Sequence, residues 1–531
     1  MLLKILMLVV FFGSMVAIGL YCRKHATNVD GFVLGGRSVG PWLTAFAYGT
    51  SYFSAVVFVG YAGQFGWKYG IAATWAGIGN ALIGSLLAWI ILGRRTRIMT
   101  QHLSSATMPE FFGKRFDAPK LKIAASIIIF IFMIPYTASL YNGLSRLFEM
   151  AFHIDYSICV IVMAILTGIY VIAGGYMATA INDFIQGIIM IVGIAAIIGA
   201  VLNLQGGFME ALKGMAAVQA VEAEVAGTPG MGWPGVFASF FGPDPVNLLG
   251  VVLLTSLGTW GLPQMVQKFY AIKSEGAINK GTIISTIFAL IVAGGCYFLG
   301  GFGRLFADKI GVNAAGVPVG GYDAVIPAML SSLPDFLIAV VVILVLSASM
   351  STLSSLVLTS SSTLTLDLLK GRVIKNMDEK KQLSTMRLLI VVFIAISVVL
   401  AIIQYKANIT FIAQLMGVSW GAMAGAFLAP FLYGLYWKRT SKAGCYASFI
   451  FSTVVMTANI FWRSSFPVII QSPINAGAFC MIFGLILVPL VSLFTPAPDK
   501  SLVENAFSCY NKQVLVRQSE ALGDNGVVQE P

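Results

Sequence analysis

The chain has 531 residues, of which 58% are hydrophobic and only 10% are charged, and its formal net charge is +11. A soluble globular domain carries about 25% charged residues, so this composition excludes a soluble domain and predicts a membrane protein with many spans. The positive charge then belongs to membrane loops, and we expect no nucleic-acid partner. The six cysteines show neither close pairing nor metal-ligand spacing, so no disulfide framework and no zinc site are predicted.

Apolar runs of about 20 residues, the length that crosses a bilayer as a helix, occur along nearly the whole chain. They predict thirteen transmembrane helices, near residues 2–21, 41–66, 71–93, 121–148, 156–173, 180–203, 248–268, 281–304, 335–364, 387–404, 409–436, 441–462 and 474–494. The first run contains Lys4 and no small-residue cleavage pattern, so we interpret it as a retained helix and not as a signal peptide.

Basic residues gather in alternate loops. The loops after the first, third, seventh, ninth and eleventh predicted helices hold Arg23, Lys24, Arg37, Arg94, Arg95, Arg97, Lys114, Arg115, Lys273, Lys280, Lys370, Arg372, Lys375, Lys380, Lys381, Lys438, Arg439 and Lys442. The opposite loop 204–247 has one basic residue, Lys213, and four acidic ones, Glu210, Glu222, Glu224 and Asp244. This asymmetry predicts an N-terminus outside the cell membrane and a cytoplasmic tail, 496–531, whose last part we expect to be disordered.

Two of the predicted helices are interrupted near mid-membrane. The second contains Gly49 within Gly-Thr-Ser-Tyr-Phe-Ser, and the seventh contains Gly258, Gly261 and Pro263. Five helices separate the two starts, so the broken helices enter from opposite sides, which is typical of an inverted-repeat transporter with its site at the breaks. We therefore expect repeats at 41–203 and 248–436 within one transmembrane domain, 1–495.

The ninth predicted helix carries a dense run of hydroxyl side chains. Ser351, Ser354 and Ser355 share one helical face, and Thr352 is adjacent to it. Such oxygens suit a hard cation like sodium, although close helix packing through small residues is the other interpretation. Asp183, at the start of the sixth helix, either caps that helix or faces the bundle interior as a functional carboxylate.

Three fragments in this order resemble the sodium/solute symporter family: Phe32-Val-Leu-Gly-Gly-Arg-Ser-Val-Gly, then Gly174-Gly-Tyr with Asp183-Phe-Ile-Gln, then Met350-Ser-Thr-Leu-Ser-Ser with Ser360-Ser-Ser and Asp367-Leu. The resemblance extends over about residues 5–495, and the chain looks most like the sodium/proline symporters and pantothenate permeases of that family. It implies an all-α, LeuT-type 5+5 inverted repeat with one extra N-terminal and two extra C-terminal helices.

The resemblance also implies site residues. The main sodium site would use main-chain and hydroxyl oxygens of Thr50, Phe53, Ala348, Ser351 and Thr352. A candidate second sodium site would use Asp183, Ser351, Ser354 and Ser355. The solute would contact Ser54, Tyr136, Thr255, Thr259 and Trp260, near the helix breaks.

The function expected from this resemblance is sodium-coupled import of a small organic solute, with a proline-like amino acid favoured. The alternative is a sodium-coupled pantothenate or monocarboxylate symporter, because Tyr52 stands where proline symporters carry an aspartate. A membrane-embedded enzyme would need a nucleophile or base with a partner, and no predicted helix pairs a histidine with an acid. A solute sensor would normally append a signalling domain, for which the tail is too short. The expected partners are sodium, the solute and the bilayer, with no obligate protein partner.

Overall fold

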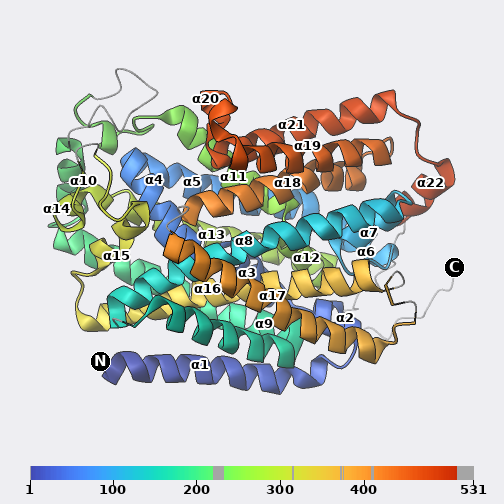
Figure 1. Cartoon of the computed structure of the whole chain (residues 1–531), viewed down its shortest axis with the longest axis horizontal. Coiled ribbons are helices and arrows are strands. Elements are labelled where there is room, and N and C mark those ends of the chain that lie inside the picture. The colour runs from blue at the N-terminus through green and yellow to red at the C-terminus, as the bar shows by residue number, and fades with distance from the viewer. Residues whose placement is uncertain are drawn as a thin grey trace, which may run out of the picture.

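The computed structural model describes residues 2–152, 154–218, 233–313, 316–370, 373–374, 376–407 and 412–510, and this part of the chain is nearly all helix. The long helices run side by side along the longest axis of the molecule, and short helices gather at its two ends (Figure 1). This is the arrangement of a membrane-spanning bundle, because each helix satisfies its own backbone hydrogen bonds.

The long elements in chain order are α1 (Leu2–Cys22), α3 (Pro41–Tyr52), α4 (Ala62–Tyr69), α5 (Thr74–Gly79), α6 (Arg94–His102), α8 (Pro119–Phe152), α9 (Tyr156–Leu204), α11 (Pro245–Gly261), α12 (Pro263–Ala271), α13 (Glu275–Gly300), α16 (Asp335–Thr363), α17 (Glu379–Ala407), α18 (Ile412–Tyr436), α19 (Lys442–Phe461) and α21 (Pro473–Phe494). Three π-helical segments, η3 (Val56–Tyr61), η5 (Asn80–Leu87) and η6 (Trp89–Gly93), continue α3 and α5.

Several helices begin at a polar cap. The side chains of Asp244, Ser274 and Ser441 accept backbone N–H groups at the starts of α11, α13 and α19. Such caps satisfy the free amides of a helix start, and they fix where each helix begins at the edge of the apolar layer. The Pro245 residue that follows Asp244 has no N–H group to satisfy at this position.

Ten helices in the described residues are long and apolar enough to cross a membrane, or eleven if α11 and α12 are one bent span. The 49 residues of α9 would measure about 74 Å as one straight helix, more than twice the thickness of a bilayer core, but α9 is two helices that meet at a kink at Gly175, where φ is 55°. The predicted helices 156–173 and 180–203 lie on the two sides of this interruption. The all-helical membrane class is confirmed, whereas the number thirteen stays a prediction.

Both mid-membrane breaks fall inside the stretches that the sequence singled out, at Phe53 within residues 49–54 and at Leu262 between Gly261 and Pro263. The α3 helix ends at Tyr52, and Phe53 is extended with φ −85° and ψ 119°. The α11 helix ends at Gly261, and Leu262 has nearly the same conformation, φ −79° and ψ 124°. Pro263 starts α12 directly after this break.

Gly49, Gly258 and Gly261 are helical and do not form the breaks themselves. They are small because neighbours approach closely: a Cβ on Gly49 would lie 2.3 Å from the Phe288 ring, and one on Gly258 would lie 2.7 Å from the Trp420 ring. Gly49 and Gly258 therefore lie inside their helices and serve packing, whereas Gly261 is the last residue of α11, directly before the break.

The broken helices lie inside the bundle, since residues 44–52 of α3 and ten residues of α11 are buried. In the most apolar stretch of α18, 94% of the residues are buried, whereas in that of α1 only 22% are. The α18 helix therefore belongs to the core, and α1 faces lipid. Figure 1 places α1 at one edge of the molecule and α19 and α21 at the opposite edge. These are the three helices that the sequence assigned outside the repeats.

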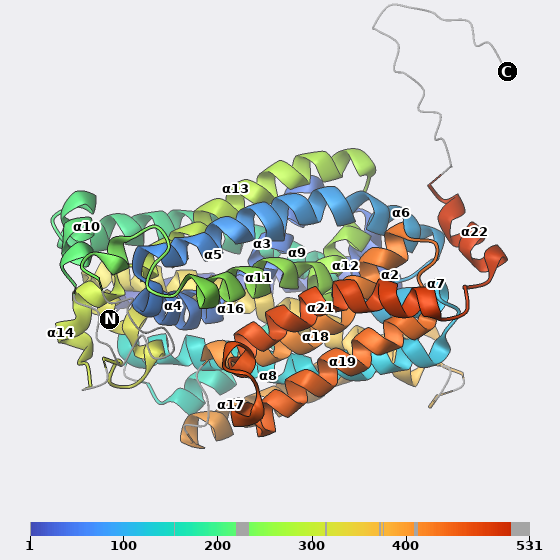
Figure 2. The same ribbon diagram turned by 90° about the horizontal axis from the view of Figure 1, so that it is seen from above.

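The two ends of the bundle differ in their elements. The helix α10 (Phe208–Ala217) and α14 (Ala307–Ile310) lie at one end, and α2 (Val29–Leu34), α7 (Met108–Arg115) and α22 (Lys500–Ser508) lie at the other (Figures 1 and 2). The first part of the tail is helical, since it contains α22. The Tyr510 hydroxyl lies 3.3 Å from each of the Arg95 and Leu435 carbonyls. Residues 511–531, with the predicted disorder, and the loop residues Glu222, Glu224, Arg372 and Lys375 lie outside the described residues.

We expect Gly261→Ala to destabilise the protein, because the added Cβ would lie 2.8–2.9 Å from backbone atoms of Ala424 and Leu428 in α18. Overpacking of this kind costs about 1–3 kcal/mol. The thermal unfolding midpoint of the purified protein should fall for this variant. Gly276→Ala is the control, since a Cβ there meets nothing within 4 Å; equal midpoints for the two variants would contradict this assignment.

Candidate functional site

The break after α3 leaves main-chain carbonyls without their helical donors. Phe53 N–H is the last to bond back, to the Gly49 carbonyl at 3.2 Å. The next residue, Ser54, belongs to the following segment, and its own carbonyl accepts from Val57 and Phe58 at 3.0 Å. The Thr50 carbonyl therefore loses the amide that an unbroken helix would supply, and it is free to face another partner.

Two hydroxyls of α16 lie against these carbonyls. The Ser351 hydroxyl is 3.1 Å from the Thr50 carbonyl and 3.1 Å from the Ala348 carbonyl. The Thr352 hydroxyl is 3.2 Å from the Thr50 carbonyl, 3.3 Å from the Phe53 carbonyl and 3.1 Å from the Ala348 carbonyl. All five residues are buried. The structure thus brings together the residues of the predicted main sodium set.

This five-oxygen cluster contains more acceptors than protons. The two hydroxyls carry one proton each, so Thr352 can donate to only one of the three carbonyls around it. The cluster also lies at the C-terminal end of α3, where the helix dipole is negative. Uncharged oxygens arranged in this way attract a small hard cation, which prefers such ligands to thiolate or imidazole.

A second polar cluster surrounds Asp183 of α9, which is fully buried. Within the described part of the chain, neither carboxylate oxygen has a hydrogen-bond partner, but the Lys268 Nζ atom lies 3.7 Å from Oδ2. That ammonium donates to the Ser355 hydroxyl at 3.0 Å, and the Ser355 oxygen is 2.7 Å from the Ser51 hydroxyl. The structure therefore joins Asp183 and Ser355 through a lysine.

The other predicted members of this set point elsewhere. The Ser354 hydroxyl donates to the Ser351 carbonyl of its own helix at 2.9 Å, and the Ser351 hydroxyl belongs to the five-oxygen cluster. Sequence reasoning missed Lys268, because the predicted seventh helix ended at this residue and a lysine at a membrane boundary usually extends toward water. The structure extends α12 to Ala271 and leaves Lys268 only 2% exposed.

A cluster of aromatic side chains lies beside the α3 break. The Trp420 ring of α18 is 5.9 Å from the Tyr136 ring of α8 and 6.1 Å from the Tyr52 ring, measured between centroids. The hydroxyls of Tyr52, Ser54 and Tyr136 and the Trp420 indole N–H are buried, and none has a hydrogen-bond partner among the residues described. The same holds for both amide atoms of Gln264, two residues after the Leu262 break.

Buried polar groups in proteins are normally hydrogen-bonded, and these are among the buried polar groups of the described residues that have no such partner. A polar solute placed here would supply the missing partners. Of the predicted solute residues, Ser54 and Tyr136 carry such unpartnered groups, and the sequence did not predict Trp420 or Gln264. The sequence signal for Gln264 was its place next to Pro263, while a tryptophan between Ser419 and Gly421 indicates only packing.

The other three predicted solute residues have their polar atoms engaged with main-chain carbonyls. The Thr255 hydroxyl donates to Val251 of its own helix at 2.8 Å. Thr259 donates to Gly84 at 2.9 Å, and the Trp260 indole donates to Ile83 at 2.9 Å, both in η5. The structure does not bring these polar atoms to the aromatic cluster, because η5 packs against this side of α11.

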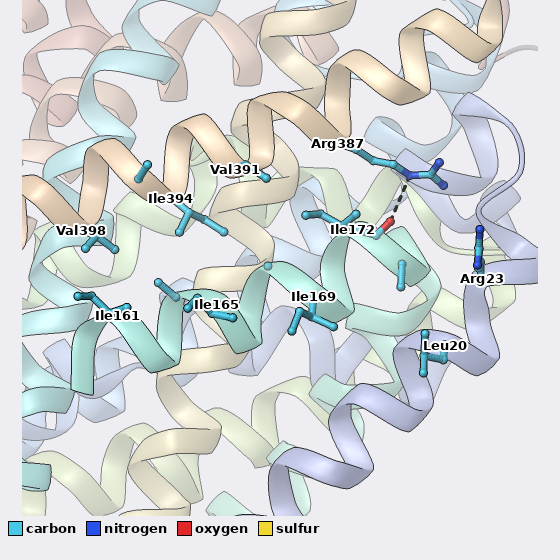
Figure 3. Close-up of a pocket in the computed structure, with 14 residues that line it drawn as sticks. Leu20, Arg23, Ile161, Ile165, Ile169, Ile172, Arg387, Val391, Ile394 and Val398 are labelled. Carbon is cyan, nitrogen blue, oxygen red and sulfur yellow. Dashed lines mark hydrogen bonds between the residues drawn. The ribbon is translucent and has the colours of Figure 1, made fainter. Parts of the chain in front are cut away.

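A groove of about 770 Å³ lies apart from both clusters, between α9 and α17 (Figure 3). Its walls are aliphatic, including Ile161, Ile165 and Ile394, and Arg23 and Arg387 lie toward one end. Arg387 donates through Nε to the Ile172 carbonyl at 3.2 Å. Walls of this kind offer a small polar solute almost no hydrogen bonds, so the groove is not the solute site.

Comparison with known proteins now gives these clusters a context. Residues 32–451 match the Sodium:solute symporter family. The sodium/proline symporter of Staphylococcus aureus strain JH9 is 29% identical over 476 residues, covering 86% of each chain, and the protein of strain N315 gives the same values. A Na+-coupled sialic acid symporter, solved in a substrate-bound outward-open state, superposes with a TM-score of 0.72 at 16% identity and covers 94% of this chain and 99% of its own. That likeness shows the fold and confirms the predicted inverted-repeat class.

Proposed function

The chain belongs to the sodium:solute symporter family, and from this premise we propose that it imports a proline-like amino acid together with sodium. It is a sodium-coupled solute symporter of many spans and not an enzyme, and sodium is the co-transported ion. The single observation that supports the mechanism most strongly is the excess of acceptor oxygens where α16 meets the break in α3.

We propose that the transported sodium binds the carbonyls of Thr50, Phe53 and Ala348 and the hydroxyls of Ser351 and Thr352. An oxygen-liganded ion of this size has ligands at about 2.3–2.6 Å, and two such ligands at a right angle lie roughly 3.3–3.7 Å apart. The hydroxyl-to-carbonyl separations of 3.1–3.3 Å are close to that spacing. Little movement would therefore be needed to bind the ion.

The solute is assigned to the region between Ser54, Tyr136, Gln264 and Trp420. A pyrrolidine ring is apolar on both faces and suits the aromatic rings, while its carboxylate suits the starts of the half-helices after the two breaks, where the helix dipole is positive. The S. aureus relative, a sodium/proline symporter, supports an amino acid.

A second candidate solute is a carboxylate without an amine, such as pantothenate or a monocarboxylate. The observation that favours it concerns Tyr52, whose ring contacts Trp420 at the break. The residues Tyr52, Ser54, Tyr136 and Trp420 carry no acidic side chain that could bind an ammonium group. Both candidates place a carboxylate at the same half-helix starts, so a direct comparison of solutes distinguishes them.

We also propose the topology that the loop charges predict, with the N-terminus outside the cell membrane and the tail 496–531 in the cytoplasm. The end of the bundle with α2, α6, α7 and α22 would be cytoplasmic, since Arg37, Arg95 and Lys114 belong to it. The repeats 41–203 and 248–436 within a single domain, 1–495, are part of the same proposal.

Purified protein in proteoliposomes should accumulate labelled proline, or the competing carboxylate, only under an inward sodium gradient. Because sodium and solute stabilise the same state, each should raise the apparent affinity for the other. Equal uptake with potassium in place of sodium would overturn the proposal. Uptake of pantothenate in preference to proline would transfer it to the second candidate.

Ser351→Ala and Thr352→Ala should each raise the half-saturating sodium concentration about a hundredfold, because each removes one of five oxygens from a desolvated ion, and a loss of about 2.7 kcal/mol has that effect. Ser349→Ala is the matched control, since this buried hydroxyl donates to Val345 of its own helix. A merely structural hydroxyl would cost about 0.6 kcal/mol in a bilayer. Sodium activation curves that coincide with the Ser349 control would place the ion elsewhere.

Gln264→Leu and Trp420→Phe should raise the solute KM by about tenfold or more at saturating sodium, because each removes a buried polar group that the solute would engage, a loss of about 1–3 kcal/mol. Gln264→Leu keeps the approximate size of the side chain, and Trp420→Phe keeps an aromatic ring there. Trp75→Phe is the control, since its indole donates to the Phe240 carbonyl at the bundle end. Unchanged KM values in both variants would exclude this region as the solute site.

A further inference from the structure

The second polar cluster already contains a cation that belongs to the chain. Lys268 Nζ lies 3.7 Å from Asp183 Oδ2 and donates to the Ser355 hydroxyl at 3.0 Å. The side chains of Lys268 and Asp183 are 3% and 0% exposed. The Tyr176 ring centroid lies 5.1 Å from the ammonium. The pair is thus electrically neutral and sealed from solvent.

This ammonium joins four elements in the way that a bound ion would. Asp183 comes from α9, Lys268 from α12 and Ser355 from α16, and the Ser355 oxygen is 2.7 Å from the Ser51 hydroxyl at the end of α3. Ser51 follows Thr50, whose carbonyl belongs to the five-oxygen cluster. Lys268 is therefore linked to the main ion site by the hydroxyls of Ser355 and Ser51.

A free sodium ion at Asp183 would have to share that carboxylate with the ammonium. Two positive charges would then lie within a few ångströms of each other in a buried region with one negative charge between them, which is strongly unfavourable where the dielectric constant is low. The ammonium is moreover covalently attached, so it needs no binding from solution. The residues around Asp183 fit one cation, and Lys268 provides it.

We propose that Lys268 is a built-in substitute for a second sodium ion, so that this symporter binds and moves one sodium per cycle. The proposal rests on the proposed function, because it takes the five-oxygen cluster as the site of the transported ion. Lys268 is a specificity-determining residue that sets the ion stoichiometry. The Lys268 ammonium moves with α12 and stays attached to the protein. Each cycle therefore transports one positive charge fewer across the membrane than a symporter of two sodium ions would.

Direct binding of ²²Na⁺ to the purified full-length protein in lipid nanodiscs tests this without knowledge of the solute. The wild type should saturate at one sodium per chain. Lys268→Met removes the ammonium and leaves Asp183 as an unpaired buried carboxylate, so this variant should saturate at two. Lys268→Arg, which keeps the charge, should stay at one.

The double variant Lys268→Met with Asp183→Asn should also return to one sodium per chain, because the cluster is again neutral. Saturation of the wild type at two, or of Lys268→Met at one, would overturn the inference. If Lys268→Met does not fold, the values for the wild type and the double variant decide the question. Ser351→Ala, made alone, should weaken the binding of that one sodium about a hundredfold. A wild type that binds no sodium at all would instead overturn the proposed function, so the two failures are distinguishable.

Discussion

The constraint on which this structure depends is that a backbone inside a membrane must satisfy its own hydrogen bonds. The fold breaks this rule at Phe53 and at Leu262, which share one extended conformation in two helices of opposite halves. Each break leaves carbonyls at the end of one half-helix and amides at the start of the next. The surrounding elements then supply what is missing. Hydroxyls of α16 do so at the first break, and their protons are too few for the carbonyls present.

The buried carboxylate of Asp183 is stabilised in a different way, by a cation that belongs to the chain. Asp183 is fully buried, and a carboxylate in such a place is tolerated only with a cation close by. Lysine suits this role better than arginine, because its ammonium is a compact point charge that a hydroxyl can complete, whereas a guanidinium would demand several planar acceptors. Ser355 provides that hydroxyl. The cation is thereby part of the polypeptide, and its position depends on the conformation of α12.

The sequence was sufficient for the class of fold and for the two interrupted helices, since both follow from hydropathy and from glycine and proline at mid-span. The residue at which each helix breaks was beyond it, because Gly49 and Gly258 are required by the rings of Phe288 and Trp420, which are distant in the chain. Spacing put Ser351 and Thr352 near each other, but their meeting with Thr50 needed either the resemblance or the structure. Lys268 was missed because the predicted helix ended at this residue. A helix that continues for a few more residues places the same lysine inside the bundle instead of at its boundary.

The proposed ion and solute sites meet at a single peptide unit, which makes their coupling a local matter. The Phe53 carbonyl faces the Thr352 hydroxyl, and within the described residues the Ser54 hydroxyl that follows has no hydrogen-bond partner. If the ion binds this carbonyl as proposed, it would fix the Phe53–Ser54 peptide plane, and with it the direction of the Ser54 amide and the start of η3. Tyr52, on the other side, contacts Trp420. The bound ion would thus order residues proposed to contact the solute, which is the differential contact that linkage requires. An unbroken α3 would hold the same residues just as near, but its carbonyls would be engaged and could neither bind the ion nor respond to it.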